Sequence, residues 1–212
     1  MSMTYMPKRP FRKKQLEGFE LSKDRKSFAL LMKMGTGKSK VLLDTSYYLY
    51  EEGKINALVI IAPKGIHTKW VKEDLPVDTP DRIPYTVGHW KSGDTKAIAQ
   101  CEGLFKKPSG QLKIVSMNIE ALQRTKSPAE VFLTKFLKEH DCLLCIDESD
   151  TIKNPDAKRS ETLMKLGLLA KYKRILTGTP LNNSPFDFYS QFTFLDKSIF
   201  GQSFFAYKHT YA

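Results

Sequence analysis

Residues 30–39 constrain the fold of this chain more than any other part of its sequence. An apolar run leads into Gly35 and Gly37, and Lys38 and Ser39 then open a pattern typical of a helix. A strand, a glycine turn and a helix N-terminus together form an anion site, because free backbone N–H groups and the positive helix end point into the turn. Lys38 has the charge to hold the β- and γ-phosphates of a nucleotide, and the Ser39 hydroxyl can bind Mg²⁺.

The match to the full phosphate-binding pattern, G-x-x-x-x-G-K-[ST], is partial. The pattern requires a glycine where this chain has Met32. A glycine turn followed by a solvated lysine is therefore the alternative interpretation of the segment.

Length and charge set the class of protein. The chain has 212 residues, enough for one large domain with a core or for two small ones. It carries 34 lysines and arginines against 23 acidic residues, a formal net charge of +11. This excess favours a polyanionic partner, and nucleic acid is favoured over an anionic membrane surface. The alternative is that the charge only makes the surface soluble, and net charge alone does not distinguish the two. No run approaches the roughly 18 apolar residues of a membrane-spanning helix, so we expect no membrane span.

Three cysteines argue against a disulfide framework and indicate a reducing compartment, so we expect an intracellular, cytoplasmic location. Cys142 and Cys145 have C-x-x-C spacing but lie in an apolar run. On a strand this spacing places the two side chains on opposite faces, which favours buried packing over redox or zinc chemistry.

Short apolar strands alternate with helical patterns along the chain. This order predicts βαβ units and a parallel sheet with helices on both faces, an α/β fold. Prolines at 76, 80 and 84 predict an irregular connection, and the aromatic tail beyond Pro185 is expected to pack on the domain. The expected strands are 28–32, 57–62, 85–87, 113–117, 142–147 and 174–177, and the expected helices are 14–21, 38–51, 66–74, 95–105, 129–140 and 157–170.

Polar segments follow these strands where each one ends. The loops after parallel strands meet at one carboxyl edge of the sheet, where ligands bind, so these segments are expected to lie together. They are residues 35–39, 63–64, 118–120, 147–150 and 177–180.

Asp147 and Glu148 stand at the end of one buried strand. One carboxylate there can hold a hydrated Mg²⁺, and the other can polarise an attacking water. The alternative is an ordinary acidic turn, and the presence of the phosphate loop argues against it.

The polar segments follow one another along the chain in the order of the motifs of superfamily 2 helicase-like ATPases, which they resemble. The resemblance is strongest to the first motor lobe of Snf2-type DNA translocases. Residues 15–18 resemble the Q motif, whose glutamine contacts adenine, and residues 34–39 resemble motif I in the form without the first glycine. The remaining matches are 62–64 with Trp70 to motif Ia, 116–120 to motif Ib, 147–150 with 152–154 to motif II, 176–180 with Asn182 and Asn183 to motif III, and 194–196 with 199–201 to the closing segment of the lobe.

The resemblance implies a RecA-like P-loop NTPase lobe over residues 27–212, preceded by a basic lead-in, residues 1–26, with the Q-motif-like helix. It also implies hydrolysis of ATP with Mg²⁺, coupled to movement on DNA through backbone contacts without sequence reading. The residues that would serve are Gln15, Gly35, Thr36, Gly37, Lys38 and Ser39 for the nucleotide, Ser39 and Asp147 for the metal, Lys38, Asp147 and Glu148 for catalysis, Asp150, Thr177, Gly178 and Thr179 for coupling, and Lys64 and Asn118 for nucleic acid.

The chain departs from the family pattern in two places. Motif II ends in Asp150, where Snf2-type proteins usually carry histidine and the DEAD-box group carries aspartate. The spacing upstream of Gln15 leaves the adenine-stacking residue open, with Phe11 and Arg12 as candidates.

The family also needs a second RecA-like lobe that supplies arginine fingers, and residues 186–212 contain no arginine. We therefore expect a fragment of a longer translocase that binds nucleotide but scarcely hydrolyses it alone, with Arg159 and Arg174 as internal substitutes if it does. Two other classes stay open at this point. A P-loop phosphotransferase does not account for the segment around Thr177, and a non-catalytic nucleic-acid-binding module does not account for the complete set of nucleotide-binding residues.

Overall fold

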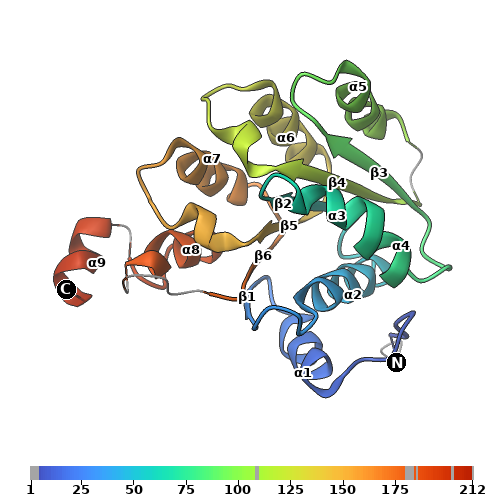
Figure 1. The fold of residues 1–212 in the computed structure, drawn as a ribbon, viewed down its shortest axis with the longest axis horizontal. Helices are drawn as coiled ribbons and strands as arrows, with labels where there is room; N and C mark the ends of the chain where they lie inside the picture. The colour runs from blue at the N-terminus through green and yellow to red at the C-terminus, as the bar shows by residue number, and fades with distance from the viewer. Residues whose placement is uncertain (1–4, 108–109, 180–183, 185, 202, 212) are drawn as a thin grey trace.

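A computed structural model describes residues 5–107, 110–179, 184, 186–201 and 203–211. It has a central sheet covered by helices on both faces (Figure 1). In the described part of the chain the sheet has six strands, all parallel, in the order β1-β6-β5-β2-β4-β3. The predicted α/β class with a parallel sheet is confirmed.

The strands lie where apolar runs predict them. They are β1 Ser27–Leu31, β2 Ala57–Ala62, β3 Tyr85–Trp90, β4 Leu112–Asn118, β5 Cys142–Asp147 and β6 Tyr172–Thr177. The largest difference is at β3, which was expected to stop at Val87 but continues through Gly88 to Trp90. A Cβ on Gly88 would lie 2.9 Å from Cys101 Sγ, so this glycine does not end the strand but allows a helix to pack closely against it.

The helices form two layers (Figure 1). One face of the sheet carries α1 Lys13–Ser22, α2 Lys38–Glu51, α3 Ile66–Lys69 and α4 Leu75–Asp78. The other carries α5 Thr95–Gly103, α6 Pro128–Glu139, α7 Lys158–Gly167 and α8 Asp187–Leu195, and α9 Phe204–Tyr211 packs on α8 through Tyr207 and Tyr189. The aromatic tail therefore packs on the domain as expected. Among the described residues, no helix combines the length and apolar character needed to cross a bilayer.

Each strand divides its side chains between two cores because successive residues point to opposite faces. In β2, Leu58 and Ile60 face α2, whereas Val59 and Ile61 face the other helix layer. Cys142 and Cys145 are buried, free of disulfides and on opposite faces, as their spacing predicts.

Residues 66–78 form one continuous helical segment, which corrects the expectation that Pro76 lies in an irregular connection. A π-helical turn, Trp70–Asp74, joins α3 to α4. Pro76 stands in the first turn of α4. The π turn ends with Leu75 N donating to Trp70 O, so Pro76, which has no N–H, stands directly after the place where the regular hydrogen-bond pattern is interrupted.

Candidate active site

The ends of three neighbouring strands bring the predicted nucleotide and coupling segments together. Strand β6 lies between β1 and β5, with Leu31 opposite Thr177 and Leu176 opposite Asp147. The loops after these strands therefore start at the same level of the carboxyl edge. The structure places the glycine loop, the Thr177–Thr179 segment and the Asp147–Glu148 pair side by side.

The glycine loop has the backbone conformation that its sequence predicts. Gly35 and Gly37 have φ values of +77° and +93°, in the region that favours glycine, and α2 begins at Lys38. A Cβ on Gly37 would lie 2.0 Å from Gln15 Nε2, so this position also lacks space for a side chain.

Gln15 is buried against the loop from α1. Its Nε2 donates to Thr36 O over 3.2 Å, and its Oε1 accepts from Arg12 N over 2.9 Å. The glutamine of the Q-motif-like helix is thereby fixed at the rim of the phosphate loop.

The Lys38 side chain is largely enclosed, with 9% exposure, and its Nζ donates to Met32 O over 2.9 Å. A Cβ on Gly178 would lie 3.3 Å from Met34 N and 3.6 Å from Lys38 Nζ. The coupling segment thus packs directly against the glycine loop, and a small residue is needed for this contact.

Asp147 is a buried carboxylate with both oxygens engaged. Trp70 Nε1 donates to Oδ2 over 2.8 Å, and Glu148 N donates to Oδ1 over 3.0 Å. Burial raises the pKa of Asp147, and the hydrogen bonds from Trp70 and Glu148 and the charges of Lys38 and Lys69 oppose that rise. Trp70, which the sequence placed in the motif Ia match, is buried in the core, and its bond to Asp147 was not predicted.

Glu148 has an unusual backbone, with a φ of +48° in the left-handed region. Residues other than glycine seldom adopt this conformation, and such positions cluster at functional sites. Burial raises the pKa of Glu148, and the negative charge of Asp147 raises it further, while Lys38 lowers it. A half-buried carboxylate of raised pKa is suited to proton transfer.

A cavity of about 330 Å³ joins these groups. The predicted residues that line it are Gln15, Gly35, Gly37, Lys38, Ser39, Asp147 and Glu148, and the lining residues that sequence analysis did not select are Arg9, Pro10, Met34, Lys40, Asp74 and Asp78. Of the two candidates upstream of Gln15, Arg12 lines the cavity, whereas Phe11 stacks on Phe19 with ring centroids 5.0 Å apart.

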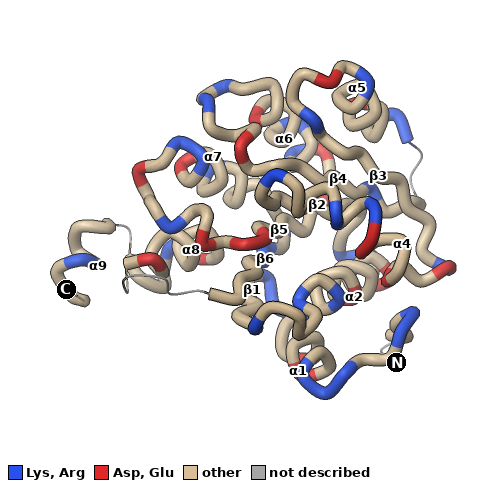
Figure 2. Tube along the Cα trace, viewed as in Figure 1, with Lys and Arg blue, Asp and Glu red and all other residues tan. Residues whose placement is uncertain are grey.

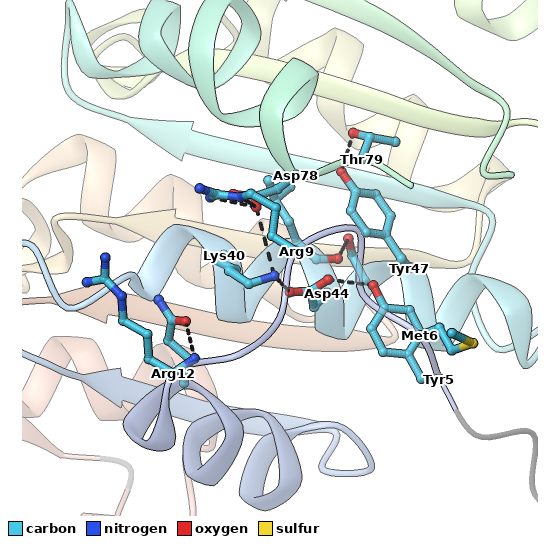
Figure 3. A network of polar contacts seen from close by, with 12 residues as sticks. Tyr5, Met6, Arg9, Arg12, Lys40, Asp44, Tyr47, Asp78 and Thr79 are labelled. Atoms are coloured by element: carbon cyan, nitrogen blue, oxygen red, sulfur yellow. Dashed lines mark hydrogen bonds and ion pairs between the residues drawn. The ribbon is translucent and has the colours of Figure 1, made fainter. Parts of the chain in front are cut away.

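Figure 3 shows a polar network that joins the N-terminal segment to α2 and α4, and its Arg9, Lys40 and Asp78 also line the cavity. Lys40 Nζ lies 2.7 Å from Asp44 Oδ2, and Tyr5 OH donates to Asp44 Oδ1 over 2.5 Å. Arg9 reaches Asp78 Oδ1 with Nε over 2.8 Å. The network fastens the N-terminal segment to α2 and α4. Lys40 and Asp44 have the i, i+4 spacing of a helical ion pair, a signal that the sequence offered.

The remaining coupling residues lie close to the site. Asp150, the last residue of motif II, is in the 3₁₀ turn Ser149–Ile152, and Ser149 Oγ donates to Gln191 Oε1 of α8 over 2.6 Å. Thr177 is buried, and its Oγ1 accepts from Thr179 N over 3.1 Å. Pro180, Asn182 and Asn183 of the motif III resemblance lie outside the described residues.

Lys64 and Asn118 lie apart from the cavity, farther along the same carboxyl edge. Ala62 pairs with Asn118 in the β2–β4 register, and Lys64 follows two residues later with an exposed side chain. Both segments meet at Glu120, which accepts from Lys64 N over 3.3 Å and from Asn118 Nδ2 over 3.2 Å. Figure 2 shows lysines and arginines spread over many elements, with a run in the N-terminal segment and the start of α1.

The donor set of the cavity fits Mg²⁺ in the presence of a nucleotide. Among the described residues, no three His, Cys, Asp or Glu side chains form a metal cluster by themselves. Mg²⁺ is usually held by one or two carboxylates together with substrate phosphates. The buried Asp147 carboxylate and the Ser39 hydroxyl match that pattern, since both line the cavity.

Arg174 is unsuitable as a substitute arginine finger, which corrects the expectation from sequence. It is fully buried, and its guanidinium donates to Ser22 O over 2.7 Å and to Arg25 O over 2.8 Å, at the end of α1. The side chain satisfies main-chain carbonyls rather than facing the cavity.

The sheet and the glycine-lysine loop define the class of P-loop α/β domains. The chain belongs to the SNF2-related domain family, whose model matches residues 19–211. The resemblance inferred from the motifs is confirmed.

Similar proteins include two from Homo sapiens. Chromodomain-helicase-DNA-binding protein 7 is 29% identical over 171 residues, which are 79% of this chain and 5% of that protein. Chromodomain-helicase-DNA-binding protein 8 is 28% identical over 208 residues, which are 94% of this chain and 8% of that protein. The chain thus spans a small part of the length of these relatives.

A solved structure shares the fold. It is the Sulfolobus solfataricus SWI2/SNF2 ATPase core in complex with dsDNA, with a TM-score of 0.73 and 24% identity. The match covers 99% of this chain and 40% of that chain. The predicted RecA-like fold is confirmed.

Proposed function

We propose that this chain is the ATP-binding first lobe of a Snf2-type DNA-dependent ATPase, which couples hydrolysis to movement on DNA. The observation that carries the proposal is the single cavity shared by the glycine loop and the Asp147–Glu148 pair. Membership of the SNF2-related domain family supports the same function.

ATP is the proposed substrate. Lys38 and the backbone N–H groups of residues 35–39 bind its phosphates, and the positive end of α2 adds to their attraction. Gln15 and Arg12 lie where the glycine loop meets α1, so the nucleoside extends from the loop toward them.

Ser39 and Asp147 would hold Mg²⁺, which neutralises negative charge on the transferred phosphoryl group. Glu148 orients the attacking water and accepts its proton. Lys38 leaves its bond to Met32 O and contacts the phosphates instead. Positioning and neutralisation of charge supply most of the catalysis in phosphoryl transfer.

Thr177, Gly178, Thr179 and Asp150 would transmit changes at the phosphates toward the DNA face. The close packing of Gly178 on the glycine loop supports this role for the coupling segment. Lys64 and Asn118 would contact the DNA backbone, which positions a protein without reading sequence. The positive net charge supports such a partner.

A second RecA-like lobe is the other proposed partner, because the match covers 40% of a SWI2/SNF2 ATPase core. That lobe would supply the arginine finger, which is worth about 10³–10⁵ in rate in related enzymes. Arg174 does not compensate, because its guanidinium is bonded to main-chain carbonyls.

The test is ATP turnover, with and without duplex DNA, by the polypeptide that joins this lobe to its second lobe. We expect DNA to raise turnover and Glu148→Gln to lower it by about 100-fold or more. Glu161→Gln, at a partly exposed glutamate of α7 outside the cavity lining, should leave it unchanged. An ATP turnover rate that is the same with and without DNA would indicate a phosphotransferase. DNA binding without any turnover would indicate a non-catalytic module, and either result overturns the proposal.

A further inference from the structure

The contact between Trp70 and Asp147 joins residues that are 77 positions apart in the sequence. Trp70 is 1% exposed and Asp147 is 6% exposed, so the 2.8 Å bond from Nε1 to Oδ2 is sheltered from water. A hydrogen bond to a charged acceptor is stronger than one between neutral groups, and low local polarity strengthens it further.

The bond leaves the carboxylate free to bind a cation. An ionised carboxylate has about four lone-pair sites, two on each oxygen. Trp70 uses one site on Oδ2, and Glu148 N uses one on Oδ1. The two donors therefore fix the plane and direction of the carboxylate and leave a site on each oxygen.

The helical segment that carries Trp70 is built around the cavity. Trp70, Asp74 and Asp78 follow one another at four-residue intervals, and both aspartates line the cavity. Trp70 opens the π-helical turn Trp70–Asp74, and such turns inside helices frequently occur at functional sites. The segment begins two residues after Lys64, and Ser116 Oγ ties it to β4 by donating to His67 O over 2.7 Å.

We propose that Trp70 is a positioning residue, whose indole N–H holds the Asp147 carboxylate in the orientation that binds Mg²⁺ with the nucleotide. The inference rests on the proposed function, because it requires nucleotide in the cavity. The competing explanation is that Trp70 only fills space between α3 and the sheet. The two differ in what the N–H does, since phenylalanine keeps aromatic bulk and lacks the donor.

The chain contains a matched control. Its second tryptophan, Trp90, is 2% exposed, and its Nε1 is buried with no hydrogen-bond partner among the described residues. Trp90→Phe therefore makes the same chemical change without removing a bond. A general effect of replacing a buried indole would appear in both variants.

The first measurement is the affinity of the chain for ATPγS, with excess EDTA and across a Mg²⁺ titration. Loss of a group that orients a metal ligand typically weakens metal binding by about 10–100-fold. We expect Trp70→Phe to raise the Mg²⁺ midpoint by about 10-fold while affinity in EDTA stays within about 2-fold of the parent. Trp90→Phe should match the parent in both conditions. In an Asp147→Asn background, Trp70→Phe should have no further effect on the midpoint, because it acts through that carboxylate.

The second measurement does not depend on how well Trp70→Phe folds. In the Trp90→Phe protein Trp70 is the one remaining tryptophan. Adding Mg²⁺ to its ATPγS complex should change the Trp70 emission, because the acceptor of the indole N–H then shares its charge with a cation. The emission of Trp90 in the Trp70→Phe protein should not respond.

The outcomes separate the two claims. A parent chain that fails to bind ATPγS overturns the proposed function, and this inference with it. If the parent binds ATPγS, either of two results overturns the inference alone. One is a Mg²⁺ midpoint that is the same in Trp70→Phe as in the parent, and the other is a Trp70 emission that does not change when Mg²⁺ is added.

Discussion

Replacing Asp44 with alanine should destabilise the fold by about 3–4 kcal/mol. Asp44 is fully buried and binds both Lys40 Nζ and Tyr5 OH. Removing one partner of a buried ion pair costs about 3–5 kcal/mol, because the other charge stays buried and unpaired. In the variant Lys40 Nζ still has Asp78 Oδ1 at 3.9 Å and the Phe11 ring at 4.7 Å. Because these groups partly compensate the charge, we expect the loss of the ion pair to cost about 3 kcal/mol, the lower end of that range. The unpaired Tyr5 hydroxyl adds about 1 kcal/mol.

Urea unfolding of the parent and the variant measures this difference from the free energies extrapolated to water. Asp141→Ala is the control, because Asp141 pairs with Lys171 at the surface over 2.9 Å, and such pairs contribute about 0–1 kcal/mol. A double variant, Lys40→Met with Asp44→Leu, should unfold within about 1–2 kcal/mol of the parent, since the buried pair is removed as a whole and Asp78 keeps its ion pair with Arg9. If Asp44→Ala costs no more than Asp141→Ala, the reasoning about the buried pair is refuted.

Three further predictions concern DNA, pH and turnover. A lobe that contacts about three phosphates should bind duplex DNA with a log K against log salt slope near −2 to −3, and salt-insensitive or sequence-specific binding in a filter assay would contradict the placement of Lys64 and Asn118. Burial and the neighbouring His67 lower the pKa of His89 to about 4 from an ordinary value near 6.5. The unfolded chain therefore binds more protons between those values, so stability should fall as pH drops from about 6.5 toward 4, and less steeply in His89→Gln. If the urea midpoint changes equally between pH 7 and 5 in the parent and in His89→Gln, His89 does not contribute to the pH dependence of stability. The isolated chain should hydrolyse ATP well below about 1 s⁻¹ with or without DNA, and faster turnover that Glu148→Gln abolishes would contradict the need for a second lobe.

Local patterns in the sequence were sufficient to predict the sheet and the edge at which the glycine loop and the Asp147–Glu148 pair meet. Fully apolar runs such as Ala57–Ala62 predict buried parallel strands, and the polar segments at their ends predict the edge where ligands bind. The glycine loop is similarly readable, because Gly35 and Gly37 have backbone conformations that few other residues adopt. The division of the chain between residues 26 and 27 stays a prediction.

Contacts between distant segments were not predictable in the same way. The bond from Trp70 to Asp147 depends on how a helix packs over the sheet, and residue spacing contains no such information. Arg174 illustrates the same limit, since its charge suggested a catalytic group while its packing bonds it to the carbonyls at the end of α1. Pro76 was misinterpreted because proline usually ends a helix, whereas here the helical segment continues through it directly after a π turn.

The N-terminal segment was expected to be a basic lead-in. Its composition did not predict that this segment packs against α2 and α4. Tyr5 and Arg9 bind carboxylates of α2 and α4, and Phe19 of α1 lies in the same core as α2. These contacts bring Arg9 and Arg12 to the cavity. Charge alone indicated a surface or a nucleic-acid contact, because it contains no information on partners distant in sequence.

The central claim is that the glycine loop binds nucleotide through Lys38, and an equilibrium titration with a fluorescent ATP analogue tests it most directly. Lys38→Ala removes the charge proposed to bind the phosphates, so affinity should fall by about 2–4 kcal/mol, roughly 30- to 1,000-fold. Lys33→Ala is the matched control, because Lys33 is exposed on the same loop and outside the cavity lining. We expect Lys33→Ala to bind like the parent and Lys38→Ala to lose detectable binding. Equal affinities for the parent and Lys38→Ala would contradict the account.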